Sequence, residues 1–313
     1  MNKKYILVLI TLITVLSGQA QNKEMTIKEM IKGTSKYVKH YSHEPIYYLE
    51  IRSNASFIVK VNDMPTANYF GLPQDGRTYP LNDDILQSGV QKISIALYPS
   101  YTDKKTQAEF LNNDATLSII ITERFWDEDD ELSEPKILAT YNLQNIDLSE
   151  KTEYKDSLTF KAEVPYNLTG WSKSKDLSQM DRKELEEKVV AFYTQFHSWY
   201  QNKEDIKILN SEYNRSLELS QANYVDKKGI EKQKNGLSSF FAENEFTLEP
   251  LENYEIQFFG NGRMVALIRT DNRNRGESAL RIKYTNKSGF RRVSIPSLLL
   301  HIPENGEELE VIR

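Results

Sequence analysis

Histidine is the residue type in this chain best suited to bind a metal or to transfer a proton near neutral pH. The sequence contains four, at His40, His43, His197 and His301. The first two are three residues apart, which would put them on one face of a helix. A metal site needs further ligands in an ordered frame, and the Tyr-Ser-His-Glu-Pro context is typical of a loop. We therefore expect structural or solvated histidines here, a locally paired strand residue at His301, and no metal or cofactor.

His197 lies in a predicted helix beside aromatic residues. One interpretation is a partly buried core histidine with a single hydrogen bond. The other is an acid/base group in an open pocket, with Tyr193 and Trp199 among the lining residues. A lone histidine without a placed carboxylate meets few of the geometric criteria for catalysis.

An acidic run, Trp126-Asp127-Glu128-Asp129-Asp130-Glu131, offers carboxylate oxygens in alternation. Such oxygens are the ligands of Ca²⁺ sites, but those sites also use a glycine or asparagine turn and a distant bidentate glutamate. Neither is evident in this run. The pattern favours a solvated hairpin loop that discourages strand aggregation.

Charge is unevenly distributed along the chain. Residues 45–165 hold 11 basic and 20 acidic side chains, whereas residues 260–292 hold nine basic and two acidic ones. In the basic segment, four arginines sit in or after predicted turns: Arg273, Arg275, Arg291 and Arg292. They predict a patch for an anionic partner. An acidic protein, a polyanionic glycan and the acidic region of this same chain all remain open as that partner.

The composition excludes several classes of function. With no Cys, the chain has no disulfide, no thiolate metal site and no cysteine nucleophile. A formal charge of −5 provides no general attraction to nucleic acid. The sequence lacks the Gly-x-Ser-x-Gly, His-Glu-x-x-His, Walker A and Rossmann motifs. We therefore expect a protein that binds rather than catalyses.

The first twenty residues predict a secretory signal peptide. Lys3 and Lys4 precede an apolar run at residues 5–16, and Ser17-Gly18-Gln19-Ala20 supplies small residues for cleavage after Ala20. A spanning helix needs about 20 apolar residues, and this run is shorter. We expect an exported, soluble protein in the periplasm or the medium, with no transmembrane segment after cleavage.

Residues 21–44 predict a short lead-in helix, and residues 45–165 predict strands separated by Gly, Pro, Asn and Asp. The strand candidates are Ile46–Ile51, Phe57–Val61, Ile93–Tyr98, Ala115–Phe125, Ile137–Leu143 and Leu158–Val164. This is the pattern of an all-β antiparallel sandwich, Ig-like or jelly-roll-like. The stretch from Leu81 to Ile95, a half-turn, Ser-Gly and an alternating strand, resembles extracellular sandwich modules, including those attached to glycosidases.

Residues 166–180 are polar and predict a linker, after which residues 181–244 predict helices. Asp181 and Glu184 have the spacing of a capping box. The first helix carries an apolar stripe at 3.5-residue spacing, made of Leu185, Val189, Phe192, Phe196 and Trp199. Further helices are expected after Asp205 and from about Gly229.

The last segment, residues 246–313, returns to strands, and two of the strand candidates are Ala279–Tyr284 and Phe290–Ile302. Tyr254–Phe259 and Met264–Ile268 flank Gly260-Asn261-Gly262, which predicts a tight hairpin. Helices followed by an antiparallel meander predict an α+β domain over residues 181–313. This order, with the passage Phe192-Tyr193…Trp199-Tyr200…Glu204-Asp205, resembles the cone-shaped NTF2-like domains, which implies a domain with an open mouth.

Together these patterns predict two domains and an exported, non-catalytic binding protein that recognises another protein, an anionic surface or a glycan. Two alternatives remain. A small-molecule-binding protein or enzyme would use the pocket near His197. A glycan-binding sandwich would need exposed aromatic side chains, such as Trp126 or Tyr101, in one shallow platform.

Overall fold

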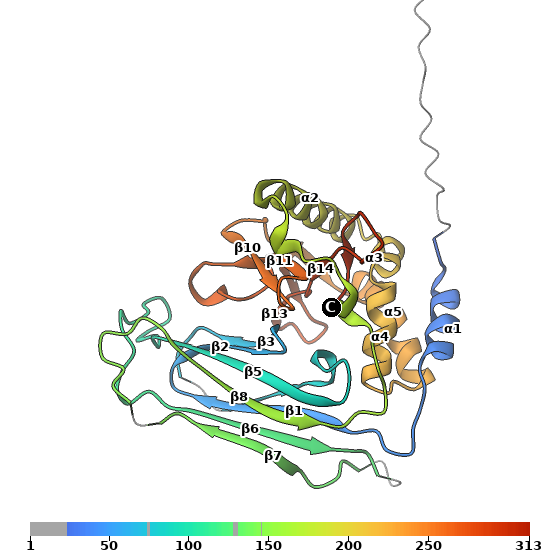
Figure 1. Cartoon of the computed structure of the whole chain (residues 1–313). Helices are drawn as coiled ribbons and strands as arrows, with labels where there is room; N and C mark the ends of the chain where they lie inside the picture. The colour runs from blue at the N-terminus through green and yellow to red at the C-terminus, as the bar shows by residue number, and fades with distance from the viewer. Residues whose placement is uncertain (1–23, 74–75, 128–130, 145) are drawn as a thin grey trace, which may run out of the picture.

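The computed structural model describes residues 24–73, 76–127, 131–144 and 146–313. Within them the fold is a β-rich mixture of four antiparallel sheets and five α-helices (Figure 1). The predicted signal peptide, residues 1–20, lies outside the described residues, and so do residues 128–130 of the acidic run. No helix in the described part is long and apolar enough to cross a membrane.

Two four-stranded sheets are formed by the chain between Ile46 and Ala162, and we call them the sandwich (Figure 1). The first has the order β4-β1-β6-β7, with β1 Ile46–Ser53, β4 Arg77–Pro80, β6 Leu117–Arg124 and β7 Lys136–Asn142. The second has the order β3-β2-β5-β8, with β2 Ser56–Val61, β3 Met64–Tyr69, β5 Gly89–Tyr98 and β8 Tyr154–Ala162.

Alternating side chains from both sheets meet in one hydrophobic cluster. In β1 these are Tyr47, Leu49 and Ile51, and in β5 they include Ile93 and Ile95. Successive side chains of a strand point to opposite faces, so every second residue reaches the same core. The predicted β-rich sandwich layer is confirmed at this level.

The sequence pattern does not predict β3 and β4. β3 contains Pro65, and β4 is only four residues long and ends at Pro80. Each lies at the edge of its sheet, where a proline leaves no ladder hydrogen bond unmade. Strands of this kind form because a neighbour pairs with them, so local alternation is a weak guide to them.

The strands and helices that follow the sandwich in sequence, called the C-terminal part, form the other two sheets and, together with α1, a helical layer (Figure 1). One sheet has the order β10-β11-β14-β15, with β10 Tyr254–Phe259, β11 Met264–Arg269, β14 Leu300–His301 and β15 Glu310–Val311. The other has the order β13-β12-β9, with β9 Glu245–Leu248, β12 Ile282–Thr285 and β13 Arg291–Ser294. The helices are α1 Ile27–Tyr37, α2 Arg182–Gln201, α3 Asp205–Ser211, α4 Tyr213–Ala222 and α5 Lys227–Glu243.

Helix α2 packs against β11 and β9 (Figure 1). Its N-cap is Asp181, whose side chain accepts a hydrogen bond from the backbone N–H of Glu184 at 2.9 Å, as the capping pattern predicts. The predicted stripe is confirmed in part. Phe192 and Trp199 are only half-buried, while Tyr193 and Tyr200 are buried. The buried face is therefore turned toward the tyrosines, because the sheet lies on that side of the helix.

The predicted lead-in helix is confirmed as α1, with a full capping box between Thr26 and Glu29. It packs against α4 and α5, and the backbone N–H of Met25 donates to the Asn210 side chain at 2.8 Å. The segment that precedes the sandwich in sequence thus belongs to the helical layer in space.

The segment predicted as a linker, residues 166–180, is packed rather than loose. Its first part contributes Tyr166 and Leu168 to the sandwich cluster, and its second part contributes Trp171 and Leu177 to the cluster of the C-terminal part. Leu86 packs against both clusters. Three short 3-10 helices lie in or near the segments that contact both clusters. They are Asn82–Asp84 (η1), Gly170–Lys173 (η2) and Leu177–Gln179 (η3).

Two further strand predictions have different outcomes. The hairpin between β10 and β11 is confirmed, with left-handed backbone at Gly260, Asn261 and Gly262 (φ 57°, 56° and 83°). The single strand expected over Phe290–Ile302 is wrong, because the chain forms two separate strands, β13 and β14. Pro296 lies between them and has no N–H to donate, so it cannot continue a sheet ladder.

Candidate functional site

The four arginines of the predicted basic patch do not lie on one surface. Arg273 and Arg275 belong to the turn after β11, which contains the 3-10 helix η4 (Asn272–Asn274). Arg291 and Arg292 belong to β13, in a different sheet. The patch therefore separates into two pairs with different surroundings.

The first pair is turned toward the sandwich. The guanidinium of Arg275 lies over the rings of Tyr98 and Phe70, 4.4 and 5.3 Å from their centroids. The backbone carbonyl of Arg275 accepts a hydrogen bond from the Asn68 side chain at 3.0 Å. The Arg273 guanidinium lies against Gly71. These contacts favour the interpretation in which this part of the basic segment serves the chain's own acidic region.

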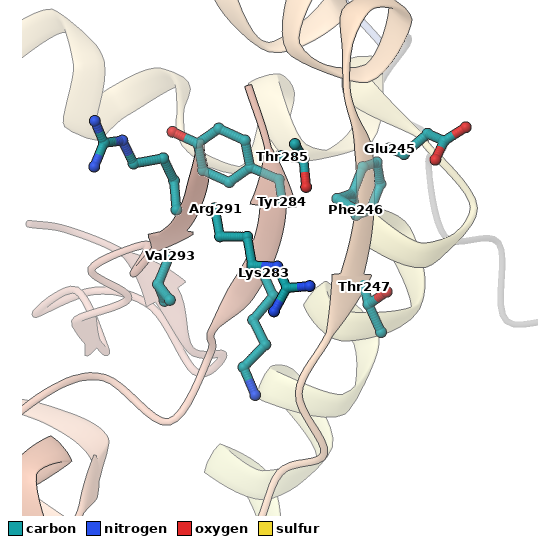
Figure 2. Close-up of a pocket in the computed structure, with 9 residues that line it drawn as sticks. Glu245, Phe246, Thr247, Lys283, Tyr284, Thr285, Arg291 and Val293 are labelled. Atoms are coloured by element: carbon teal, nitrogen blue, oxygen red, sulfur yellow. The ribbon is translucent and has the colours of Figure 1, made fainter. Parts of the chain in front are cut away.

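The second pair lies in an open groove across β9, β12 and β13 (Figure 2). The groove has a volume of about 750 Å³. It is lined by Glu245, Phe246, Thr247, Lys283, Tyr284, Thr285, Arg291, Arg292 and Val293. Figure 2 shows Tyr284 between the strand that carries Arg291 and the strand that carries Phe246.

Strand register explains which side chains face outward. Tyr284 pairs with Arg292 on one side and Phe246 on the other, so these three share a face. The Phe246 and Tyr284 rings pack on Phe240 of α5, with centroids 5.5 and 5.1 Å away. The opposite face of the sheet, which carries Lys283 and Arg291, is therefore the exposed one.

The groove contains both paired and unpaired cations. Lys283 lies 3.1 Å from Glu249, and Lys287, just outside the groove, lies 3.0 Å from Glu243. Neither Arg291 nor Arg292 forms an ion pair with any residue that the structure describes. Two exposed arginines thus remain available to an anionic group.

Apolar side chains surround these arginines. Phe290, Val293 and Ile295 have exposed fractions of 58%, 43% and 38%. The Arg292 guanidinium lies 5.5 Å from the centroid of the Phe290 ring. Among the described strands, β13 has a neighbour on one side only, so its outer edge is free to pair. A free edge flanked by cations and apolar side chains is suited to bind an extended chain.

The second predicted site has a packing role where it is described. Tyr193 is fully buried and donates its hydroxyl hydrogen bond to the carbonyl of Leu298 at 2.6 Å. His197 is half-buried and has Nε2 3.1 Å from the carbonyl of Glu249. Trp199 packs against Phe196, with ring centroids 5.0 Å apart. The contacts of these three side chains are a buried hydroxyl, a bond to a backbone carbonyl and a ring contact, which are contacts of a packed core.

The aromatic side chains named for a glycan platform also differ in exposure. Trp126 is 58% exposed, but Tyr101 is 4% exposed and packs with Phe70 and Tyr98. Only one of the two could therefore contact a sugar from the surface.

The remaining histidines and carboxylates form no metal site within the described part of the chain, where no group of three or more possible ligands comes together. His40 lies 3.0 Å from Glu44, and the His43 ring packs against Phe125. His301 is buried and has Nδ1 2.6 Å from the hydroxyl of Ser174. Burial lowers the pKa of His301 to about 4.

Sequence reasoning singled out Arg291 and Arg292 but missed the aromatic floor made by Phe246 and Tyr284. Tyr284 lies in a predicted strand, and its alternation with Ile282 was the available signal. Phe246 lies in β9, a four-residue strand that only its pairing with β12 reveals. Comparison of the chain with protein-family models, curated proteins and solved structures gave no match.

Proposed function

We propose that this protein is an exported, non-catalytic binding protein that holds an acidic, extended segment of another protein along strand β13. The observation that carries the proposal is the free edge of β13, where two unpaired arginines stand among exposed apolar side chains. Export rests on the signal-peptide pattern of residues 1–20.

The chemistry of the edge suits this occupant. An added strand would form main-chain hydrogen bonds with β13, and its alternate side chains would meet the outward face of the sheet. Because consecutive side chains of a strand alternate, carboxylates on one face of the added strand would pair with Arg291 beside Val293. Carboxylates on its other face would pair with Arg292. Arginine binds carboxylates with two parallel N–H donors, which adds orientation to charge attraction.

Charged edges also protect sheets from unwanted pairing. That protective role would need no apolar side chains beside the charges. The edge of β13 nevertheless exposes the apolar side chains of Phe290, Val293 and Ile295, which favour association with another chain. The combination of charge and apolar surface therefore supports recognition of a partner.

The organisation that goes with this proposal is a two-domain chain. Its first domain, residues 45–165, is an Ig-like or jelly-roll-like sandwich, and its second, residues 181–313, is an α+β domain of NTF2-like character. The separation of the buried residues into two main clusters supports the division. The proposed binding edge then belongs entirely to the second domain.

The test uses the fluorescent hexapeptide Glu-Glu-Val-Glu-Glu-Val as the probe, because its carboxylates occur on both faces of an extended chain, with anisotropy as the readout. We expect Arg291→Glu with Arg292→Glu to weaken binding about tenfold or more, since two attractive contacts become repulsive. The matched control is Lys104→Glu with Lys105→Glu, which makes the same change in net charge at two exposed residues of the sandwich. Equal weakening by both variants would reduce the effect to net charge and remove the site from β13.

A second probe tests the mode of binding. The same hexapeptide with N-methylated amides keeps its charge but cannot add a strand. We expect it to bind much more weakly. If it binds as well as the unmodified peptide, the groove acts as a general polyanion site, as for an acidic glycan, and the strand-addition proposal fails.

A further inference from the structure

A second cavity lies between the sandwich and the β10–β11 hairpin, and it shares no lining residue with the β13 groove. Its volume is about 700 Å³, within the range of small-molecule sites. One wall is the outer face of β2, β5 and β8, and the other comes from β10, β11 and the turn that follows. Figure 1 shows the hairpin facing these sandwich strands. We call this cavity the interlobe cleft.

Contacts between the two walls hold the cleft in shape. Beside the hairpin turn, the backbone N–H of Asn261 donates to the Asp63 carboxylate at 2.9 Å, and the N–H of Gly260 donates to the Asp63 carbonyl at 3.3 Å. Beyond β11, Arg275 stacks on Tyr98. Because both walls are fixed by such contacts, the cleft is formed before any ligand arrives.

Most charges in the interlobe cleft are already neutralised. Lys60 pairs with Asp63 at 3.3 Å, and Lys155 pairs with Glu153 at 2.7 Å. Arg269, which is buried, pairs with Asp271 at 2.6 Å. These pairs leave little net charge for a purely anionic or purely cationic ligand.

Two further lining charges have neutral partners: Asp156 accepts hydrogen bonds from the hydroxyls of Tyr141 and Tyr154 at 2.7 and 3.0 Å, and Arg275 stacks on Tyr98. Two opposite charges on opposite walls then remain with neither an ion pair nor a ring contact among the described residues. Lys92 extends from β5 of the sandwich, and Glu255 extends from β10 of the C-terminal part. Within the described residues, the hydrogen bond that Glu255 accepts comes from the neutral Gln257 side chain, at 2.7 Å. A ligand that bridges the walls would meet an ammonium group on one side and a carboxylate on the other.

The surface of the cleft also includes apolar side chains. Ile58 and Ala96 belong to the sandwich wall, and Phe259 belongs to the hairpin wall. The Lys60 ammonium lies 4.7 Å from the centroid of the Phe259 ring, which fixes the ring in place. The cleft therefore combines apolar contact with one free positive and one free negative group.

We propose that the interlobe cleft binds a short peptide with free amino and carboxyl ends. Its carboxylate pairs with Lys92, its ammonium pairs with Glu255, and its side chains cover Ile58, Ala96 and Phe259. This site is separate from the β13 edge and does not depend on the function proposed for it.

The experiment measures binding of the tripeptide Ala-Phe-Ala to the whole protein by isothermal titration calorimetry. We expect Ala96→Trp to abolish binding, since an indole at that position occupies the cleft. The matched control is Val90→Trp, on the same strand at a position that is 73% exposed and outside the cleft. Circular dichroism confirms that both variants fold, and the Glu-Val hexapeptide reports that the β13 edge is intact.

Blocked peptides and charge variants identify the recognised groups. We expect N-acetylation or C-amidation of the tripeptide to weaken binding about tenfold each, the loss of one ion pair in a partly enclosed site. Glu255→Gln should remove the preference for a free amine, and Lys92→Met the preference for a free carboxylate. No binding of Ala-Phe-Ala at about 1 mM, equal binding by Ala96→Trp, or equal binding of the doubly blocked peptide would each overturn the proposal.

Discussion

The guanidinium carbon of Arg275 lies 4.4 Å from the centroid of the Tyr98 ring. Tyr98 ends strand β5 of the sandwich, and its hydroxyl donates to the Glu153 carboxylate at 2.7 Å. Arg275 follows strand β11 of the C-terminal part. One stacked pair thus joins the basic segment of the chain to its acidic segment, and it does so through a ring face rather than a salt bridge.

Replacing Arg275 tests how much this contact stabilises the fold. We expect Arg275→Ala to lower the free energy of unfolding by about 1–2 kcal/mol, since a partly buried cation–π contact is lost. Arg275→Lys should recover only part of this, because an ammonium group lacks the planar stacking surface. Urea unfolding provides the measurement, with Arg291→Ala on exposed β13 as the control. Equal effects at the two positions would contradict the assignment.

The buried carboxyl group of Asp84, in η1, should make the free energy of unfolding fall as the solution becomes basic. Burial raises the pKa of Asp84 to about 7, with the hydrogen bond from Thr66 at 2.7 Å acting in the opposite direction. The folded state therefore holds this proton more tightly than the unfolded chain. The resulting stabilisation is complete below the ordinary carboxyl pKa and is lost as pH rises through about 7.

Asp84→Asn removes this pH dependence, because the amide stays neutral and still accepts from Thr66. We expect the variant to exceed the wild type at about pH 8 by a few kcal/mol, on the order of 2–4, and to match it more closely at about pH 5. Urea unfolding at the two pH values measures the difference. Asp114→Asn in an exposed loop serves as control, and an Asp84→Asn slope equal to that of the wild type would refute the prediction.

The buried ring of His301 should make the free energy of unfolding fall at acidic pH. Because burial lowers the pKa of its ring to about 4, the folded state disfavours the protonated form. The stability due to the neutral ring is present above its ordinary pKa of 6.5 and is lost as pH falls through about 4. His301→Gln cannot be protonated in this range.

The expected result for His301→Gln is a weaker fall in the free energy of unfolding between about pH 6.5 and pH 4. At neutral pH the variant should be less stable than the wild type, because the ring no longer fills its place beside Ser174. Direct titration of the His301 ring by NMR provides an independent check. A midpoint near 6.5 would show that the ring is solvated in the folded protein.

Replacing Lys234 of α5 with an apolar residue should stabilise the fold. Lys234 is buried, it approaches the hydroxyl of Ser216, and its ammonium lies 5.3 Å from the centroid of the Tyr213 ring. Burial lowers its pKa to about 8, so stability is present above the ordinary lysine value and is lost as pH falls through about 8. Lys234→Met should therefore be more stable at about pH 7 by about 1–2 kcal/mol, after allowance for partial solvent screening. Thermal unfolding of both proteins measures this, and a lower midpoint for the variant would contradict it.

Several elements could be predicted because their signals are local. The turn at Gly260, Asn261 and Gly262 follows from residues that accept positive φ at low cost. The start of α2 follows from the side chain of Asp181, which caps backbone groups only three residues away. The long strands β1 and β5 follow from their alternation, since both bury one face in the same core.

The short strands could not be predicted in the same way. β4 and β9 have four residues each, and they pair with β1 and β12, which lie tens of positions away in the sequence. β3 pairs with the adjacent strand β2, but Pro65 interrupts its strand pattern. The site depends on such pairing, because β9 lies beside β12 and brings Phe246 next to Tyr284. The separation of Arg275 from Arg291 likewise depends on which sheet each segment joins.

The sequence by itself determined the local elements of this protein, its excess of acidic residues in one region and of basic residues in another, and the four arginines of interest. Turns, caps and alternating strands arise from interactions over a few residues, which a sequence displays directly. Only the tertiary structure decided that Arg275 stacks on Tyr98 while Arg291 and Arg292 lie on a free edge. The physical reason is that strand pairing joins residues tens of positions apart, and packing between the lobes joins residues more than a hundred positions apart, as in Arg275 and Tyr98. The residues next to each partner in the sequence do not indicate such contacts.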